Sequence, residues 1–341
     1  MCLISRENKM KSICNIIILL AMLISVSCSG KTSAAAESQS VEDQFAERGS
    51  FSADSAYSYV KRQVDFGPRV PGSDAHKACR EWLVEQLSAY ADTVTVSGTP
   101  VTAWDGATIP VHNIFARFKP ESQARILLAA HYDTRPWADH DPDSDARLKP
   151  IYGANDGASG VGVLLEIARN LAKENPEVGV DILLTDAEDY GARDDSPRAH
   201  EEDTWCLGAQ QFARNLPYTA ADTPRYGILL DMVGGRGAVF HQEYFSTRYA
   251  QKPTAKVWAM ARKLGLTDRF PAKEGGAIND DHLPLIRAGI PTTDIIESNN
   301  ASTGSFNPTW HTHDDNMDNI DPSSLSAAGR VVLNVIYSEK P

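Results

Sequence analysis

Four short apolar runs constrain the fold of this chain most, because each is continuous rather than alternating with polar residues. The runs are Arg125–Ala130, Val180–Thr185, Tyr226–Leu230 and Thr292–Ile296. Continuous runs of this kind are typical of strands that are covered on both faces. Helical patterns separate and follow them, at Gly157–Lys173, Trp205–Asn215, Thr247–Leu264 and Ser323–Ser338. This alternation predicts an α/β fold with a mainly parallel, twisted open sheet sandwiched by helices.

Other segments complete the expected domain. Asp54–Tyr90 has helical spacing with a Gly-Pro-Arg-Val-Pro-Gly break, and Val94–Ser97 with Asn113–Phe118 predicts a hairpin at one edge of the sheet. Arg135–Pro150 and Tyr190–Asp203 are long and polar. Because long loops in a compact domain are usually functional, we place both at the rim of the functional site.

The first 50 residues have the composition of a targeting signal followed by a tether. The apolar run Ile13–Ile24 is too short to span a bilayer, and small residues precede Cys28. Residues 1–28 therefore predict a signal peptide of the lipoprotein type, with simple secretion as the alternative. Residues 29–50 predict a flexible tether and residues 51–341 a single domain. We expect an exported protein, either periplasmic or anchored to the bacterial envelope by a lipid on Cys28.

Charge and cysteine content narrow the classes of partner. The net charge of −12 argues against binding to nucleic acid and to an anionic membrane surface. Two cysteines after Cys28, Cys79 and Cys206, do not make a disulfide framework. We interpret them as isolated buried thiols, with pairing as the alternative. We also expect a monomer.

Histidine and carboxylate residues gather at the ends of the predicted strands and the starts of the predicted helices. They are His131, Asp133, Asp156, Glu188, Asp189, Asp231 and His311. Ligand sites in open α/β sheets lie beyond the carboxyl ends of the strands. Asp156, Asp189 and His311 are of the residue types that bind zinc. Glu188 adjoins a candidate ligand without being one, which suits a general acid/base.

Seven stretches follow one another across residues 52–338 in an order that is specific as a set. They are Phe66-Gly-Pro-Arg-Val-Pro-Gly72, Ala130-His-Tyr-Asp-Thr134, Gly153-Ala-Asn-Asp-Gly-Ala-Ser159, Asp186-Ala-Glu-Asp189, Leu230-Asp-Met-Val233, Asp280-Asp-His-Leu-Pro284 and Trp310-His-Thr312. Together they resemble the glutaminyl cyclases, which share their fold with the two-zinc aminopeptidases of the M28 group. The resemblance selects Asp156, Asp189 and His311 as the ligands of one zinc ion.

The choice between a cyclase and a peptidase depends on a few positions. His131 and Asp231 match ligands of the second zinc in the peptidases, but the cyclases have them as well. Trp310 before the metal histidine, the Asp-Asp-His-Leu-Pro stretch at 280–284 and the Glu188-Asp189 pair all resemble the cyclases.

The resemblance implies a zinc-dependent acyltransferase, a glutaminyl-peptide cyclotransferase, that converts N-terminal glutamine to pyroglutamate and releases ammonia. Zinc would polarise the γ-amide carbonyl, and Glu188 would carry the proton from the amine to the leaving nitrogen. Asp231 and Asp281 would orient Glu188, with Asp281 favoured over Asp280. Trp310 would pack on the glutamine side chain. A two-zinc aminopeptidase is the alternative.

Several residues keep two interpretations. Trp205 is either a substrate-side aromatic or a core residue, and His131 has either a structural role or a second metal. His313 is read as a surface or supporting residue. The acidic stretch Asp139–Asp145 is read as a solvated loop rather than a calcium site.

Overall fold

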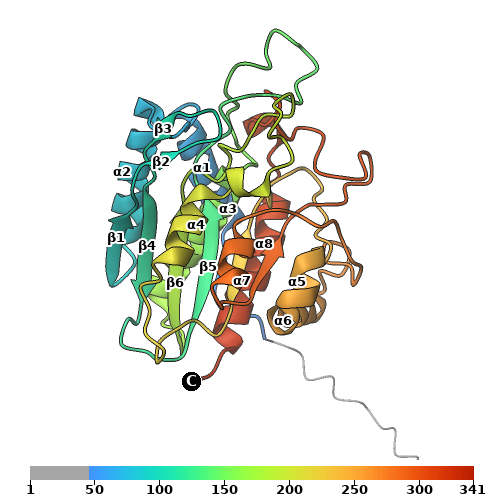
Figure 1. The fold of residues 1–341 in the computed structure, drawn as a ribbon. Helices are drawn as coiled ribbons and strands as arrows, with labels where there is room; N and C mark the ends of the chain where they lie inside the picture. The colour runs from blue at the N-terminus through green and yellow to red at the C-terminus, as the bar shows by residue number, and fades with distance from the viewer. Residues whose placement is uncertain (1–45) are drawn as a thin grey trace, which may run out of the picture. The chain divides into compact units, whose positions relative to one another are not determined.

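The computed structural model describes residues 46–341, which belong to one α/β unit built on a six-stranded sheet (Figure 1). In the order β1-β4-β6-β5-β7-β8, the strands are Thr93–Ser97, Asn113–Phe118, Gly179–Thr185, Arg125–His131, Gly227–Leu230 and Thr292–Ile295. β5 is parallel to β6 and β7, and β7 is parallel to β8. β4 is antiparallel to both β1 and β6. The predicted sheet and its antiparallel edge pair are therefore confirmed.

Helices cover both faces of the sheet, which explains why the apolar runs are continuous. In β5, Ile126 and Leu128 pack into one buried cluster, and Leu127 and Ala129 pack into another. The first cluster also holds residues of α1 (Ala53–Val64), α2 (Asp74–Ser88), α3 (Ala158–Lys173), α6 (Gln251–Lys263) and α8 (Pro322–Ser338). The second holds residues of α4 (Leu207–Arg214) and α7 (His282–Arg287). Successive side chains of a strand point to opposite faces of the sheet. Because helices cover both faces, the side chains on both must be apolar.

Two predicted helices have different bounds in the structure. The segment predicted from Trp205 becomes helical only at Leu207, because Cys206 has a left-handed backbone with φ 56°. The segment predicted as Thr247–Leu264 is divided at Ala250, where ψ is 40°, into α5 (Tyr244–Tyr249) and α6. Short elements complete the fold: β2 (Val101–Thr102), β3 (Thr108–Ile109), η1 (Glu202–Thr204) and η2 (Met317–Asn319).

The predicted signal peptide and residues 29–45 of the predicted tether lie outside the described residues. The last residues assigned to the tether contact the domain. The backbone N–H of Arg48 donates to Asn334 Oδ1 at 2.7 Å, and that of Ser50 donates to Asn170 Oδ1 at 3.0 Å. The contacts of the domain therefore begin before residue 51.

Two further features of the described part bear on the sequence predictions. Cys79 and Cys206 are both buried and unpaired, as predicted. Within residues 46–341, no helix has both the length and the apolar character needed to cross a membrane.

Candidate active site

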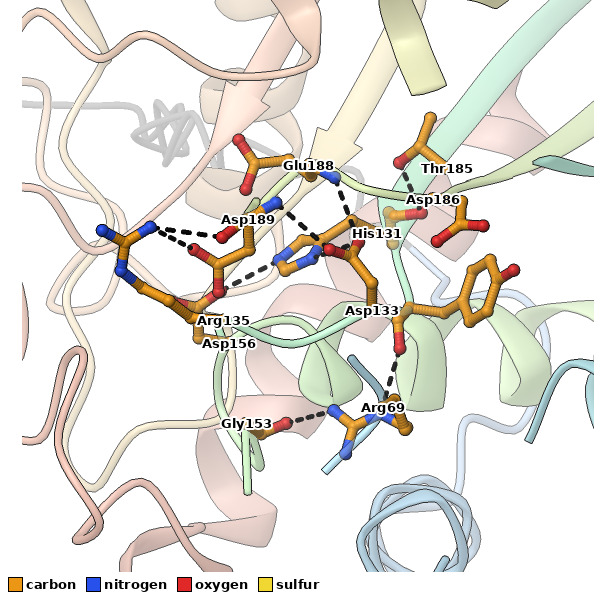
Figure 2. Close-up of polar contacts among 12 residues, drawn as sticks. Arg69, His131, Asp133, Arg135, Gly153, Asp156, Thr185, Asp186, Glu188 and Asp189 are labelled. Atoms are coloured by element: carbon orange, nitrogen blue, oxygen red, sulfur yellow. Dashed lines mark hydrogen bonds and ion pairs between the residues drawn. The ribbon is translucent and has the colours of Figure 1, made fainter. Parts of the chain in front are cut away.

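The carboxyl ends of the parallel strands β5, β6 and β7 bring together the polar residues predicted there. Figure 2 shows those of β5 and β6, among them His131, Glu188 and Asp189. His131 ends β5, Glu188 and Asp189 follow β6, and Asp231 directly follows β7. Next to them lies a cavity of about 330 Å³. Its lining includes Asp156, Glu188, Asp189, Asp231 and Asp280, the aromatic side chains of Trp205, Phe306 and Trp310, and His311.

Three larger hollows in the described domain, of about 490, 650 and 390 Å³, lack this chemistry. The first has no histidine or carboxylate in its lining. The second has one carboxylate, Glu339, which pairs with Lys256 and accepts a hydrogen bond from Tyr226. The lining of the 390 Å³ hollow has two exposed carboxylates, Glu202 and Asp203, and no histidine. Convergent titratable side chains, rather than volume, identify the candidate active site.

Asp156, Asp189 and His311 bring three ligand atoms into positions that fit a zinc ion. His311 Nε2 lies 3.3 Å from Asp189 Oδ1 and 3.6 Å from Asp156 Oδ2. Ligand atoms bound tetrahedrally at about 2.0–2.1 Å from zinc would lie about 3.3 Å apart. Both carboxylate oxygens of Asp189 are buried without a hydrogen-bond partner. The three side chains therefore suit zinc in donor type and in spacing.

The electrostatics of these side chains also favour a cation. Burial lowers the pKa of His311 well below its ordinary value, so that the imidazole is neutral and able to bind a metal. Burial and the neighbouring Asp156 carboxylate raise the pKa of Asp189 well above its ordinary value. A bound divalent cation would remove this penalty on the ionised carboxylate.

Two buried aspartates hold the backbone that carries the candidate ligands. Asp315 accepts hydrogen bonds from the backbone N–H groups of Asn155 and Asp156 at 2.7 and 3.1 Å. Asp133 accepts from the N–H groups of Glu188 and Asp189 at 3.1 and 3.2 Å (Figure 2). Acceptors of this kind orient the groups that bind or face a metal.

The first motif of the sequence supplies a fixed support for the same loop. Arg69 is fully buried and donates to the carbonyl oxygen of Gly153 at 2.7 Å (Figure 2). It also donates to the carbonyl oxygens of Tyr132 and Tyr152 at 3.0 and 2.7 Å. One guanidinium group thereby joins the end of β5 to the loop that presents Asp156.

His131 lies between two carboxylates of the site. Its Nε2 atom is 3.0 Å from Asp156 Oδ1 and 3.2 Å from Asp231 Oδ1. Burial alone would lower the pKa of His131, but contacts with Asp133, Asp156 and Asp231 outweigh burial and raise that pKa well above its ordinary value. His131, Asp156 and Asp231 are also close enough to hold a cation together. The position of His131 is therefore compatible both with a structural role and with the binding of a second metal ion.

Glu188 stands among other acidic groups at the cavity wall. One ligand atom each from Glu188, Cys206, Asp280 and Asp281 lie within 4.8 Å of one another. Burial raises the pKa of Glu188 well above its ordinary value, and Asp280 and Asp281 raise it further against the opposing charge of His131. A carboxyl group in such a place can both accept and donate a proton.

The two adjacent aspartates before α7 have different surroundings. Asp280 lines the cavity, and burial together with the Asp231 carboxylate raises its pKa to about 7. Asp281 is completely buried, is absent from the cavity lining and accepts a hydrogen bond from the Thr185 hydroxyl at the end of β6. The sequence favoured Asp281 over Asp280 as the carboxylate that orients Glu188. Both aspartates lie close to Glu188, but only Asp280 lines the cavity.

Aromatic rings form the other side of the cavity. The rings of Trp310 and His311 have centroids 3.8 Å apart, and Phe306 lies 4.5 Å from Trp310. The ring of Trp205 is parallel to that of His311 at 6.1 Å. Trp205 and Trp310 therefore both face the site, which favours the first of the two interpretations of Trp205.

Comparison with known proteins gives the family. The family described as "Peptidase family M28" matches residues 113–336. The crystal structure of Bacteroides thetaiotaomicron glutaminyl cyclase bound to N-acetylhistamine is 50% identical, with a TM-score of 0.83 over 86% of this chain and 100% of that chain. This chain belongs to the glutaminyl cyclases of peptidase family M28.

Two other similar proteins frame this membership. The glutaminyl-peptide cyclotransferase of Bos taurus is 25% identical over 299 residues, which cover 77% of this chain and 76% of the relative. A structure named as a leucine aminopeptidase precursor from Bacteroides thetaiotaomicron VPI-5482 is 49% identical, with a TM-score of 0.82 over 86% of this chain and 100% of that one. Proteins named as cyclases and a protein named as a peptidase precursor thus have the same fold, as the resemblance of the sequence motifs implies.

Near the candidate metal ligands, this glutaminyl cyclase domain has side chains that the sequence patterns did not single out. Arg135 is fully buried and donates to Asp139 Oδ1 at 2.7 Å and to the carbonyl oxygen of Asp189 at 3.2 Å. Asp139 Oδ1 lies 3.6 Å from His311 Nδ1. Asp139 was read as part of a solvated loop, because an Arg and an Asp four residues apart in a polar stretch are a weak signal.

His313 lies two residues after His311 and contacts an aspartate of a neighbouring loop. Its Nδ1 and backbone N atoms lie 2.8 and 2.9 Å from Asp141 Oδ2, and the side chain is partly exposed. The contact ties the loop that contains Asp141 to the segment that carries His311, in agreement with the supporting role read from the sequence.

Proposed function

We propose that this chain is a glutaminyl-peptide cyclotransferase, which converts the N-terminal glutamine of peptides and proteins to pyroglutamate with release of ammonia. The observation that carries the proposal is the position of Glu188, a buried carboxyl group of raised pKa, on one cavity wall with Asp156, Asp189 and His311. The chain is also 50% identical to a glutaminyl cyclase. The reaction needs one proton carrier, one electrophilic ion and an apolar wall. This cavity offers a candidate proton carrier, candidate ligands for the ion and an aromatic wall.

The proposal includes one zinc ion per chain, held by Asp156, Asp189 and His311. When bound, zinc supplies a Lewis acid that polarises the γ-amide carbonyl of the substrate. The buried, unpartnered oxygens of Asp189 and the neutral imidazole of His311 support this assignment.

Glu188 carries the proton in the proposed reaction. Its carboxylate accepts a proton from the substrate α-amino group as that nitrogen attacks the γ-carbon. A five-membered lactam forms, the γ-carbon–nitrogen bond breaks, and Glu188 returns the proton to the departing nitrogen, which leaves as ammonia. Because the same group acts first as base and then as acid, a pKa raised from the ordinary value assists both steps.

Neighbouring side chains orient the substrate and Glu188. We assign Asp231 and Asp280 to the carboxylate pair that contacts the amine and keeps a shared proton beside Glu188, since both line the cavity and Asp231 raises the pKa of Asp280. Trp310 packs against the methylene groups of the glutamine side chain. Asp281, which the sequence favoured, is left as the alternative to Asp280.

The proposed function is tested with a dipeptide that begins with glutamine. We expect the purified protein to release ammonia and pyroglutamyl product in equal amounts, and to release no amino acid from a neutral aminopeptidase substrate. The same dipeptide with an acetylated α-amine is the control and should yield no ammonia, since its nucleophile is blocked. Free amino acids from the second substrate, without ammonia from the first, would overturn the proposal in favour of a peptidase.

A pair of substitutions separates the roles of the adjacent aspartates. We expect Asp280→Asn to lower kcat about 10- to 100-fold, as loss of a supporting side chain at a metal site commonly does. Asp281→Asn keeps an oxygen for the Thr185 hydroxyl, and we expect its kcat to stay within about fivefold of the wild type. Steady-state kinetics and the melting temperature of both variants give the comparison. A larger loss of kcat in Asp281→Asn than in Asp280→Asn would return the role to Asp281.

A further inference from the structure

The side chain of Cys206 contacts the carboxyl group of Glu188. Its Sγ atom lies 3.2 Å from Glu188 Oε1, with the thiol as the donor. Within residues 46–341, the Glu188 carboxyl group has this one hydrogen bond. Cys206 is only 2% exposed, and burial raises its thiol pKa well above the ordinary value. The thiol therefore keeps its proton and acts as a donor rather than as a nucleophile.

Backbone hydrogen bonds also join the segment that contains Cys206 to the segment that contains Glu188. The N–H of Cys206 donates to the carbonyl oxygen of Glu188 at 2.9 Å, and the N–H of Leu207 donates to that of Ala187 at 3.0 Å. Ala187 and Cys206 both have left-handed backbones, with φ 53° and 56°. Residues other than glycine rarely adopt this conformation unless the surrounding structure requires it. The start of α4 is therefore fixed against the segment that carries Glu188.

We propose that Cys206 is a positioning residue for Glu188, whose thiol holds one carboxyl oxygen and so directs the carboxyl group towards the cavity. The inference rests on the proposed function, because it assigns Cys206 a role through the proton carrier of that reaction. A long, unbranched carboxylate at a cavity wall has several side-chain rotamers. One donor at 3.2 Å, fixed by two backbone hydrogen bonds, selects among them.

Kinetics of three cysteine variants of the zinc-loaded enzyme test this role. We expect Cys206→Ala to lower kcat about 5- to 10-fold with KM and zinc content unchanged, since one weak hydrogen bond to the Glu188 carboxyl group is lost. Cys206→Ser keeps a donor and should recover kcat to within about twofold of the wild type. Cys79→Ala, at the other buried free cysteine of the domain, is the control and should leave kcat unchanged.

Two kinetic outcomes would overturn the inference. One is a Cys206→Ala variant with wild-type kcat. The other is a Cys206→Ser variant as slow as Cys206→Ala, which would indicate packing rather than donation. A wild-type protein without cyclase activity would instead contradict the proposed function.

The infrared S–H stretching band tests the contact without reference to activity. The band of Cys206 is identified as the one lost in Cys206→Ala. We expect this band to shift in Glu188→Gln, because the acceptor changes from a carboxyl group to an amide, while the Cys79 band stays in place. An unchanged Cys206 band in Glu188→Gln would show that the thiol does not bind Glu188, whatever reaction the enzyme catalyses.

Discussion

Glu188→Gln is expected to lower kcat about 10²- to 10⁴-fold, the usual contribution of general acid–base catalysis, while zinc stays bound. The amide has the shape of the carboxyl group and keeps an oxygen for the Cys206 thiol, but it cannot accept the proton of the α-amine. Asp156, Asp189 and His311 are unchanged, so the zinc content should equal that of the wild type. Ammonia release and metal analysis on the same preparation provide both measurements.

A matched glutamate separates this effect from a general effect of removing one charge. Glu81 is exposed on α2 and pairs with Lys77 at 2.7 Å. We expect Glu81→Gln to keep wild-type kcat, because exposed ion pairs contribute little and this one lies outside the cavity lining. If Glu188→Gln also kept kcat within about tenfold of the wild type, well short of this contribution, another group would have to carry the proton.

The architecture could be predicted from the sequence because the apolar runs report burial directly. Each of the four runs coincides with a strand to within one residue at either end, and both faces of the sheet are covered. Helix bounds were less predictable where one residue departs from the helical backbone. Cys206 delays the start of α4, and Ala250 divides α5 from α6. Neither departure has a sequence signal, since cysteine and alanine are not residues that mark a left-handed turn or a break.

The sequence predicted which residues belong to the candidate site better than it predicted how their side chains are oriented. Strand ends identified Glu188, Asp189 and Asp231, because parallel strands end at the same edge of the sheet. The sequence could not tell which of Asp280 and Asp281 faces the cavity, since the orientation depends on the Thr185 hydroxyl, far away along the chain. In general, local sequence patterns do not predict contacts between residues that are far apart along the chain.

The contact of Cys206 with Glu188 illustrates this limit. The two residues are 18 positions apart and belong to different segments. An isolated cysteine in a helical pattern indicates only a small buried side chain. Cys206 has a left-handed backbone, and its N–H and that of Leu207 bind the carbonyl oxygens of Glu188 and Ala187, which brings the thiol to its partner.

His311→Ala is expected to lower zinc affinity by at least about 100-fold and to abolish cyclase activity at ambient zinc. Loss of a supporting residue at a metal site costs about 10- to 100-fold, and loss of a ligand should cost more. The remaining Asp156 and Asp189 would leave two buried carboxylates without a third ligand. Zinc titration against a competing chelator gives the affinity.

The neighbouring histidine supplies the control for this substitution. His313 lies two residues away, is partly exposed and contacts Asp141 rather than the proposed ligands. We expect His313→Ala to retain zinc affinity within about tenfold, the lower bound for a supporting residue. The wild type should bind one zinc ion per chain. Two zinc ions per wild-type chain, with one retained in His311→Ala, would mean that His131, Asp156 and Asp231 hold a cation as well, which is the arrangement expected of a two-zinc peptidase.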